Sequence, residues 1–457
     1  MGRLGRFTLV VLCALAFASA AQAKPLLGVY GNEARFEALI GQKSTVRLAF
    51  LGWGQGLSFG SPFVTLFKTL GPIPMIHLNT GSGSKEAITP AQIAAGKGDG
   101  YLVGLNHAIS EYGGGIYIRP MAEMNNATNV WSAFTKSGAA KPGHSTADYR
   151  KAFSRIYLIL HGGSTATVSR KLKALGMPGI TQDLASNPFP RLRIVWNPLA
   201  GGSPRIAANS AASYYPGRAY VDVEGVDIYD ESTGAPWQAV QDAYKTALSH
   251  HKPFAIPEFG LISVDDPAFV TQACSFLNTH TVEEASFYEG NPGGPFDLAA
   301  KPKSKDVYTN CVPLLGAALP AWAASKPGTT PVSGAPSVAF TLQGAAVGSP
   351  IQAPIGADEL EVDIAPATGV IGSAFWIRSG KALAKMTIPD GVTGLLFQTK
   401  VGGTAPDPII RPHAGTDFHV KWNSAGVITS AWWTRVGKLL AQITVTPGQT
   451  SIAMTQG

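Results

Sequence analysis

The sequence has little charge, little cysteine and no long apolar run. Only 14% of its 457 residues are charged, and lysine and arginine form no cluster, so nothing indicates a nucleic-acid-binding surface. No apolar segment reaches the length of a transmembrane helix, which argues against a membrane anchor. Residues 28–32, Gly-Val-Tyr-Gly-Asn, also lack the Gly-rich pattern of a phosphate-binding turn.

The N-terminus predicts a secretory signal peptide, residues 1–23. Two arginines precede an apolar segment, 7–17, and residues 21–23, Ala-Gln-Ala, match a cleavage site. Cleavage before Lys24 would release a secreted protein, extracellular or periplasmic. The net charge would then fall from +7 to +5, because 34 basic residues would remain against 29 acidic ones.

Cysteine and histidine residues give little support to a metal centre or a cofactor, and we expect neither. His250 and His251 are adjacent on a predicted helix, so they face different directions and cannot chelate an ion together. Of the three cysteines, only Cys274 and Cys311 remain after the predicted cleavage. An oxidising compartment permits a disulfide between them, but two buried thiols are an equal alternative, since spacing alone does not decide.

Residues 24–322 alternate apolar strands with amphipathic helices, which is the pattern of an α/β fold and specifically of a (β/α)8 TIM barrel. Most of the strands are continuous apolar runs, as expected for parallel strands buried on both faces. The alternative is an open doubly wound sheet, which the missing phosphate-binding turn disfavours. The predicted strands are Leu27–Tyr30, Val46–Trp53, Ile73–Thr80, Gly115–Glu123, Leu192–Pro198, Tyr220–Asp230, Phe254–Gly260 and Ala285–Asn291. The predicted helices include 89–112, 146–161, 237–250 and 265–279.

A second domain is predicted beyond a linker rich in Pro, Ser, Thr and Gly at 323–337. Residues 338–457 contain short strands separated by turn residues, which indicates a β-sandwich. Exposed tryptophans can stack on sugar rings, so one interpretation is a carbohydrate-binding domain. The other is that these rings form the core, and adjacent Trp432 and Trp433 must face opposite sides of a strand. The tryptophans concerned are Trp376, Trp422, Trp432 and Trp433. The predicted strands are 338–342, 359–364, 373–377, 383–388, 394–399, 417–422, 428–434 and 439–445.

Two glutamates close predicted barrel strands. Glu123 ends the fourth strand and Glu258 ends the seventh. In a (β/α)8 barrel the active site lies at the C-terminal ends of the strands. Two carboxyl groups about 5–5.5 Å apart are the equipment for hydrolysing a glycosidic bond with retention of configuration. The pair therefore predicts a glycoside hydrolase.

Polar residues near these strand ends complete a candidate site. Arg119 lies on the same strand face as Glu123 and could keep a carboxylate ionised, while Asn125 could bind a sugar hydroxyl. Asp227 and Tyr229 share a face at the end of the sixth strand. A hydrogen bond donated by the Tyr229 hydroxyl would orient the nucleophilic carboxylate. Packing at the barrel rim is the alternative role for this ring.

Three motifs resemble glycoside hydrolase family 26, which holds β-mannanases and related β-glycanases. They are Arg-Pro-Met-Ala-Glu-Met-Asn-Asn at 119–126, the segment 213–229, and Lys-Pro-Phe-Ala-Ile-Pro-Glu-Phe-Gly at 252–260. The resemblance covers roughly residues 26–317 and implies the role of each site residue. It makes Glu123 the acid/base, Glu258 the nucleophile, Asp227 and Tyr229 the strand-six pair near the nucleophile, and Trp196 and His77 subsite residues.

The chain departs from that family beside Glu123. The family usually has His-Glu-Met-Asn-Gly followed closely by tryptophan, whereas this chain has Ala122, Asn126 and a displaced Trp131. Alanine cannot bind a sugar hydroxyl, so mannan specificity does not follow from the resemblance. We predict a secreted, monomeric retaining endo-β-glycanase acting on a polysaccharide. The alternatives are a non-catalytic polysaccharide-binding or matrix protein on the same scaffold, or an enzyme for β-1,3-xylan, β-glucan or an exopolysaccharide.

Overall fold

The structure is a computed structural model that describes residues 24–53, 63–82, 85–232, 237–324 and most of 339–455. The predicted signal peptide, and the predicted linker from residue 325 on, lie outside the described residues. Among the residues described, none of the helices combines the length and apolar character that crossing a membrane requires.

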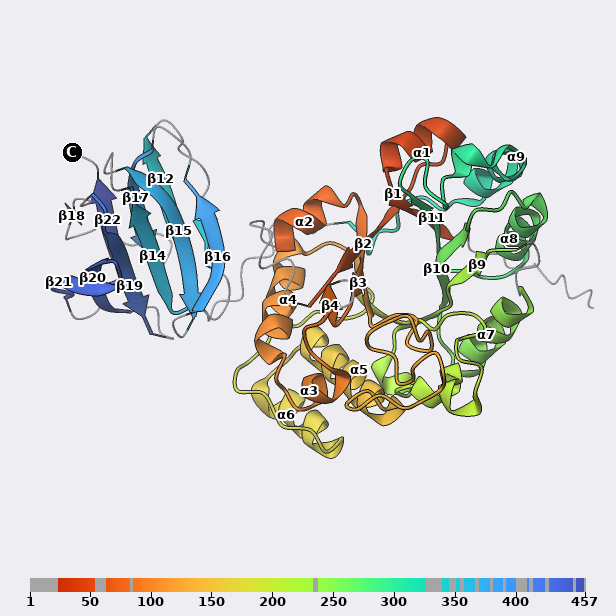
Figure 1. The fold of residues 1–457 in the computed structure, drawn as a ribbon, viewed down its shortest axis with the longest axis horizontal. Coiled ribbons are helices and arrows are strands. Elements are labelled where there is room, and N and C mark those ends of the chain that lie inside the picture. Colours follow the sequence, from red (N-terminus) through yellow and green to blue (C-terminus); the bar gives the residue numbers. More distant parts are fainter. Residues whose placement is uncertain are drawn as a thin grey trace, which may run out of the picture.

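A closed parallel barrel forms the first domain, as predicted (Figure 1). Its strands follow the order β11-β1-β2-β3-β6-β7-β8-β10, and β10 pairs with β11 to close the ring. The predicted sixth strand is divided into β8 and β9, and β9 pairs with the end of β10. The strands are β1 Leu26–Gly31, β2 Val46–Leu51, β3 Ile73–Leu78, β6 Ile116–Pro120, β7 Leu192–Trp196, β8 Val223–Gly225, β9 Ile228–Asp230, β10 Phe254–Leu261 and β11 Glu284–Gly290. A short hairpin, β4 Gly81–Ser82 and β5 Lys85–Glu86, follows β3.

Helices surround the barrel, and one predicted helix is divided. The expected helix 89–112 breaks after its first turns, because Gly96 adopts φ 84°, a left-handed conformation that a right-handed helix cannot contain. Asp266 caps the helix predicted at 265–279, with a proline at its first position. The α-helices are α1 Glu33–Ile40, α2 Phe63–Thr69, α3 Pro90–Ala94, α4 Asp99–Tyr112, α5 Thr146–His161, α6 Thr165–Ala174, α7 Trp237–Ser249, α8 Pro267–Thr279 and α9 Pro302–Cys311. Short 3-10 helices are η1 Ala207–Asn209, η2 Ala211–Tyr214, η3 Arg218–Tyr220, η4 Leu298–Ala300 and η5 Val312–Leu315.

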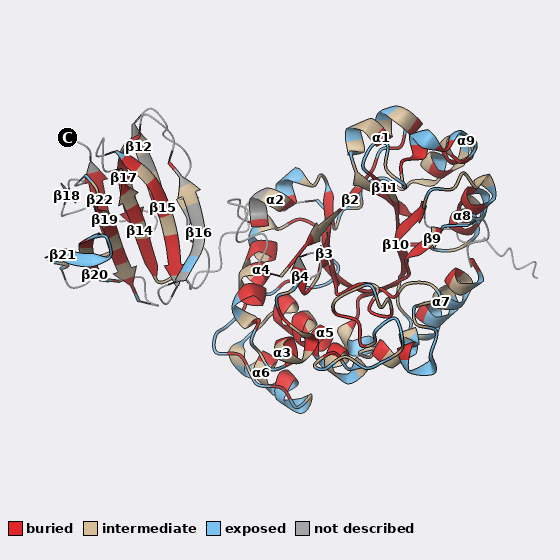
Figure 2. Cartoon of the chain, viewed as in Figure 1, coloured by how far each residue is buried: buried red, intermediate tan, exposed pale blue. Residues whose placement is uncertain are grey.

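The barrel strands are largely buried (Figure 2), and their inner apolar side chains form a cluster that includes residues after α9. Ala323 is 2% exposed, and its carbonyl accepts a hydrogen bond from Gly115 at 3.0 Å. The Arg193 guanidinium lies 3.7 Å from the ring centroid of Trp322, a cation–π contact. Ala323, which we predicted as the first linker residue, therefore packs with the barrel.

A disulfide joins Cys274 on α8 to Cys311 at the end of α9, with the Cα atoms 6.2 Å apart. The sequence left open whether these cysteines form a disulfide or remain two thiols, and the structure has the disulfide. It links two neighbouring outer helices and closes a loop of 37 residues.

The C-terminal residues form two sheets with mainly antiparallel pairing, which agrees with the predicted sandwich. One sheet has the order β13-β12-β17-β22-β18 and the other β16-β15-β14-β19-β20-β21, and their apolar residues share one core. Three strands, β13, β18 and β22, were not predicted. The strands are β12 Ala339–Gly344, β13 Ile351–Gln352, β14 Glu359–Ile364, β15 Ile371–Arg378, β16 Lys381–Thr387, β17 Val392–Gln398, β18 Ile409–Ile410, β19 Asp417–Trp422, β20 Ile428–Arg435, β21 Lys438–Ile443 and β22 Ser451–Thr455.

The tryptophans of this domain are mostly core residues. Trp376, Trp422 and Trp433 are 1%, 8% and 6% exposed, so the sugar-stacking interpretation is wrong for these three. Trp432 lies on the opposite face of β20, as the alternation predicted, and its half-buried ring stacks on His419 with centroids 4.9 Å apart.

Candidate active site

Arg119 joins three strands at the catalytic end of the barrel. Its fully buried guanidinium donates through Nη1 to Glu258 Oε1 at 2.8 Å and through Nη2 to Asp227 Oδ2 at 2.7 Å. Arg119 lies on β6, Asp227 between β8 and β9, and Glu258 on β10. The predicted pairing of Arg119 with a carboxylate is therefore present, and its partners are Glu258 and Asp227.

Glu258 receives a second donor from Tyr229 on β9, whose hydroxyl donates to Oε2. Both carboxylate oxygens are thus held, one by Arg119 and one by Tyr229. Burial, and then the negative charge of Glu258, raise the pKa of Tyr229 well above its usual value. The hydroxyl consequently remains a proton donor, and the two contacts fix the carboxylate in one orientation.

Asp227 lies deeper than Glu258 and is fully buried. Burial raises the pKa of Asp227 well above its usual value, and Arg119 opposes that rise. The charges of Glu258 and Glu123 raise this pKa further, so three carboxyl groups compete for the positive charge of one guanidinium.

Glu123 lies in a tight turn three residues beyond β6. Met121 and Glu123 have φ values of 48° and 51°, in the left-handed region that non-glycine residues seldom adopt. Such residues cannot continue a strand, so β6 ends at Pro120 rather than at Glu123 as predicted. The Glu123 N–H donates to Asn197 O at 2.7 Å, which fastens the turn to the end of β7. A strained backbone held in this way is a common feature of functional sites.

The pKa of the Glu123 carboxyl group is raised into the neutral range. Burial, and then the charge of Glu258, raise its pKa to about 7, against hydrogen bonds from Asn126 and Asn129 and the charge of Arg119, which lower it. A group with a pKa near 7 can both give and take a proton at neutral pH.

Two asparagines that the sequence reasoning did not select support Glu123. Asn126 Nδ2 donates to Glu123 Oε2 at 3.0 Å, and Asn129 Nδ2 donates to the Glu123 backbone carbonyl at 3.0 Å. Trp131 Nε1 donates to the Ala122 carbonyl at 2.9 Å. The signal that could have found them is the departure from the family motif itself, which falls on Ala122, Asn126 and the displaced Trp131.

Asn125, for which we predicted a contact with a sugar hydroxyl, binds the backbone of the loop after β7. It is 3% exposed, and its amide forms a pair of hydrogen bonds with the Leu199 backbone, each 2.9 Å long. Since both the donor and the acceptor of the side chain are engaged, Asn125 fastens the loop after β7 to the Glu123 turn. These two bonds occupy one N–H and one lone pair of the amide, and the predicted contact with a sugar hydroxyl stays a prediction.

His77 and Trp196 lie at strand ends as expected, and both are almost fully buried. The His77 ring contacts Phe50 and Trp131, with centroids 4.9 and 5.5 Å away. Burial, and then the charge of Arg119, hold the pKa of His77 well below its usual value, so the ring is neutral. Neither nitrogen of His77 nor Nε1 of Trp196 has a hydrogen-bond partner among the described residues. Their role as subsite residues stays a prediction.

Aromatic rings form a wall beside Glu258. Tyr30 contacts Phe50 and Tyr288 with centroids 4.9 and 4.5 Å apart, and Phe296 lies 4.5 Å from Tyr288. Tyr229, the donor to Glu258, touches Tyr288 at 5.8 Å. These rings come from the ends of β1, β2 and β11 and from the segment after β11, and they are only partly buried. Rings of this kind suit the apolar face of a sugar, and the sequence reasoning did not select them.

Comparison with curated proteins finds one similar over part of the chain. Endoglucanase H of Acetivibrio thermocellus is 22% identical over 312 residues, which are 65% of this chain and 31% of that protein. The chain is similar to family 26 glycoside hydrolases. The match thus spans about a third of the length of the curated relative, and no protein-family profile matches the sequence.

Three of the solved structures to which the chain is similar carry the name mannanase. The Bacillus subtilis mannanase BCman is 17% identical with a TM-score of 0.41, over 62% of this chain and 85% of that one. A GH26 β-mannanase of Bacteroides ovatus, BoMan26A, is 13% identical with a TM-score of 0.42, over 63% and 88%. A Cellulomonas fimi endo-β-1,4-mannanase double mutant is 15% identical with a TM-score of 0.42, over 93% and 94%.

Proposed function

We propose that this protein is a secreted retaining endo-β-glycanase that hydrolyses a polysaccharide with Glu258 as nucleophile and Glu123 as acid/base. The observation that carries the proposal is the contrast between the two carboxyl groups. Glu258 is held by two donors, Arg119 and Tyr229, whereas Glu123 is half-buried in a strained turn and has a pKa of about 7. Pairs of carboxyl groups whose surroundings separate their protonation states are typical of acid/base assignments in hydrolases.

In the first step the Glu258 carboxylate attacks the anomeric carbon, and Glu123 gives its proton to the glycosidic oxygen as the C–O bond breaks. The product is a glycosyl ester on Glu258 and a released sugar hydroxyl. Ester formation removes the negative charge of Glu258, which is one cause of the raised pKa of Glu123. That pKa therefore falls, and ionised Glu123 acts as the base. It takes a proton from the water that attacks the anomeric carbon and frees Glu258.

Two substitutions test this assignment. Glu258→Ala and Glu123→Ala are each expected to abolish polysaccharide cleavage while the circular dichroism spectrum stays unchanged. The Glu123→Ala protein should still form the glycosyl ester from an aryl glycoside with an acidic leaving group, because that group departs without a proton. Full activity of either variant on polysaccharide would refute the assignment.

The polysaccharide itself is not determined by these residues. A reducing-sugar assay on β-mannan, β-1,3-glucan, mixed-linked glucan, β-1,3-xylan and bacterial exopolysaccharides would identify it. The same panel tests the alternative of a non-catalytic polysaccharide-binding protein, for which no polymer would be cleaved. Secretion is a separate part of the proposal, and N-terminal sequencing of the exported protein should begin at Lys24.

A further inference from the structure

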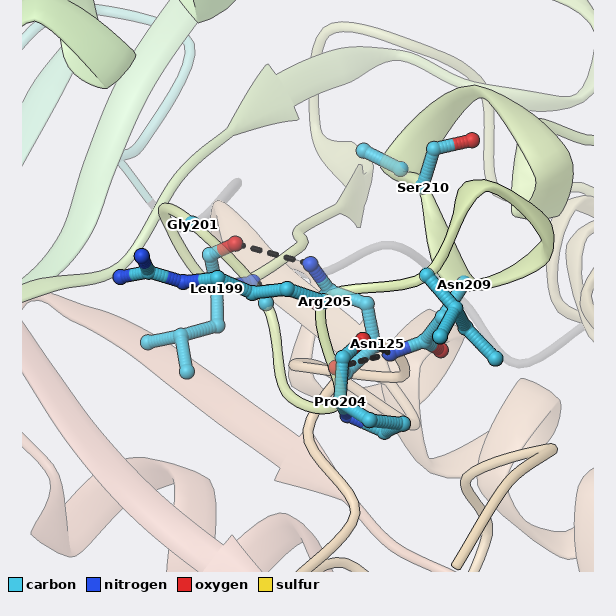
Figure 3. Close-up of a pocket in the computed structure, with 10 residues that line it drawn as sticks. Asn125, Leu199, Gly201, Pro204, Arg205, Asn209 and Ser210 are labelled. Carbon is cyan, nitrogen blue, oxygen red and sulfur yellow. Dashed lines mark hydrogen bonds between the residues drawn. The ribbon is translucent and has the colours of Figure 1, made fainter. Parts of the chain in front are cut away.

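A pocket of about 280 Å³ lies between the Glu123 turn and the loop that follows β7 (Figure 3). Residues from both segments line it, and most of them belong to the loop. The lining includes Asn125, Leu199, Pro204, Arg205, Ile206 and Asn209. The aromatic wall beside Glu258 contributes none of the lining residues, so this pocket is a second feature of the barrel mouth.

Hydrogen bonds hold the walls of the pocket in place. The Asn125 carbonyl accepts from Asn209 Nδ2 and from the Ser203 N–H, each at 2.8 Å, and Ala127 N–H donates to Ser203 O at 2.7 Å. Gly202 has φ 46°, and a Cβ at this position would lie 2.7 Å from Asn125 Nδ2. Because the loop is fitted this closely to the turn, the pocket exists without a ligand.

The pocket lies on the acid/base side of the site. Asn125 follows Glu123 by two residues. Leu199 follows Asn197 by two residues, and the Asn197 carbonyl accepts the Glu123 N–H at 2.7 Å. The proton donor of a glycosidase faces the oxygen of the leaving group. The sugar unit beyond the cleaved bond therefore extends on the Glu123 side, and the turn that carries Glu123 also contributes Asn125 to this pocket.

One charged group lines the pocket. Leu199, Pro204 and Ile206 make an apolar surface suited to a sugar ring, and Arg205 is the charged residue in the lining. Figure 3 shows the Arg205 and Leu199 side chains extending in the same direction from the loop. Among the ion pairs of the described residues, none involves Arg205, whereas Arg119 pairs with two carboxylates. A free guanidinium is suited to bind a planar carboxylate through two parallel hydrogen bonds.

We propose that this pocket binds a sugar unit bearing a carboxylate on the leaving-group side of the cleaved bond, with Arg205 as its partner. The substrate class is then an acidic polysaccharide, such as a uronate-containing β-glycan. This inference rests on the proposed hydrolase function. The net charge of +5 expected after cleavage, from 34 basic and 29 acidic residues, favours the approach of a polyanion.

The test compares one uronate-containing β-glycan with the same polymer after chemical reduction of its carboxyl groups. The wild-type protein should cleave the acidic form with a kcat/KM at least about 10-fold higher, since a charge-assisted pair contributes roughly 1.5–3 kcal/mol. Arg205→Gln should lower kcat/KM on the acidic polymer by about 10- to 100-fold and leave the reduced polymer nearly unaffected. Arg205→Lys keeps the positive charge but not the paired donors of the guanidinium, so its kcat/KM on the acidic polymer should lie between those of wild type and Arg205→Gln.

Arg218→Gln is the matched control, because Arg218 is exposed on η3 and does not line the pocket. It should behave as wild type on both polymers. Equal loss on both polymers with Arg205→Gln would overturn the proposal, because it would mean a structural role for Arg205. So would wild-type protein that cleaves the two forms equally well.

The two hypotheses fail differently. If the protein cleaves neutral glycans and shows no preference for acidic ones, the carboxylate-binding site is refuted while the glycanase function stands. If no polymer is cleaved, the glycanase fails, and calorimetric binding of the two polymers to wild type and Arg205→Gln still decides the pocket. Equal binding of both polymers to both proteins would then refute it.

Discussion

Asn126 donates its side-chain amide to Oε2 of Glu123 at 3.0 Å. Asn126 stands where the family motif has glycine, so this contact has no counterpart in that motif. Asn129 and Trp131 add hydrogen bonds to the backbone of the same turn. The departures from the motif are therefore concentrated around Glu123, the proposed acid/base, and one of them, Asn126, supplies a hydrogen bond to its carboxyl group.

Replacing Asn126 by alanine is expected to raise the pKa of Glu123 above its value of about 7, because a donor to the charged form is lost. The first step needs protonated Glu123, so activity falls as pH rises through this pKa. The alkaline limb of the kcat/KM profile should move to higher pH by roughly half a unit to one unit. The exposed Asn310→Ala on α9 serves as control. An unmoved alkaline limb would show that Asn126 does not tune Glu123.

Tyr229→Phe should slow hydrolysis by about 10- to 100-fold, because a hydrogen bond to a charged carboxylate contributes roughly 1.5–3 kcal/mol. The ring contacts with Tyr288 and Phe296 remain, so the thermal midpoint should change little. Steady-state kinetics on the preferred polymer give the measurement. Tyr244→Phe, on α7 and packed against Phe254, makes the same chemical change away from the site and should be neutral. Wild-type kcat/KM in the Tyr229 variant would contradict the positioning role.

Glu284→Gln is expected to stabilise the fold at alkaline pH. Glu284 is fully buried at the start of β11, accepts from Ser286, and burial raises its pKa to about 8. The folded state binds this proton more tightly than the unfolded state, whose carboxyl keeps a pKa near 4.5. The contribution of this group to the free energy of unfolding is therefore greatest below about pH 4.5. It is lost as pH rises toward 8, at up to about 1.4 kcal/mol per pH unit.

Glutamine removes that dependence. Thermal melts at pH 5 and pH 8 should show a smaller loss for Glu284→Gln than for wild type. The exposed Glu111→Gln on α4 should follow wild type. Parallel losses for all three proteins would mean that Glu284 does not titrate in this window.

Trp322→Ala should destabilise the barrel by roughly 2–3 kcal/mol, because the half-buried ring packs against Arg193 and Tyr117. Guanidinium unfolding followed by circular dichroism measures the loss. Leu314→Ala, at a residue 70% exposed, is the matched control and should cost little. An unchanged midpoint for the Trp322 variant would mean that this ring does not contribute to the stability of the barrel.

The barrel and the identity of the two glutamates followed from local patterns. Continuous apolar runs, helix caps and their alternation are properties of neighbouring residues, and so they predicted the existence and the order of the barrel strands. Errors occurred where backbone geometry overrides composition. Gly96 divides an apparently continuous helix, and the left-handed Glu123 turn shortens β6 to Pro120.

The sequence by itself determined that a (β/α)8 barrel carries Glu123 and Glu258 at one end, because strand periodicity and the chain order of the strands place them there. Only the tertiary structure decided what each polar group does. Arg119 meets Glu258 across 139 residues of chain, and Asn125 meets Leu199 across 74. The pKa of Glu123 near 7 likewise depends on burial and on a distant charge. Such contacts depend on how strands far apart in the chain come together, and no local pattern encodes them.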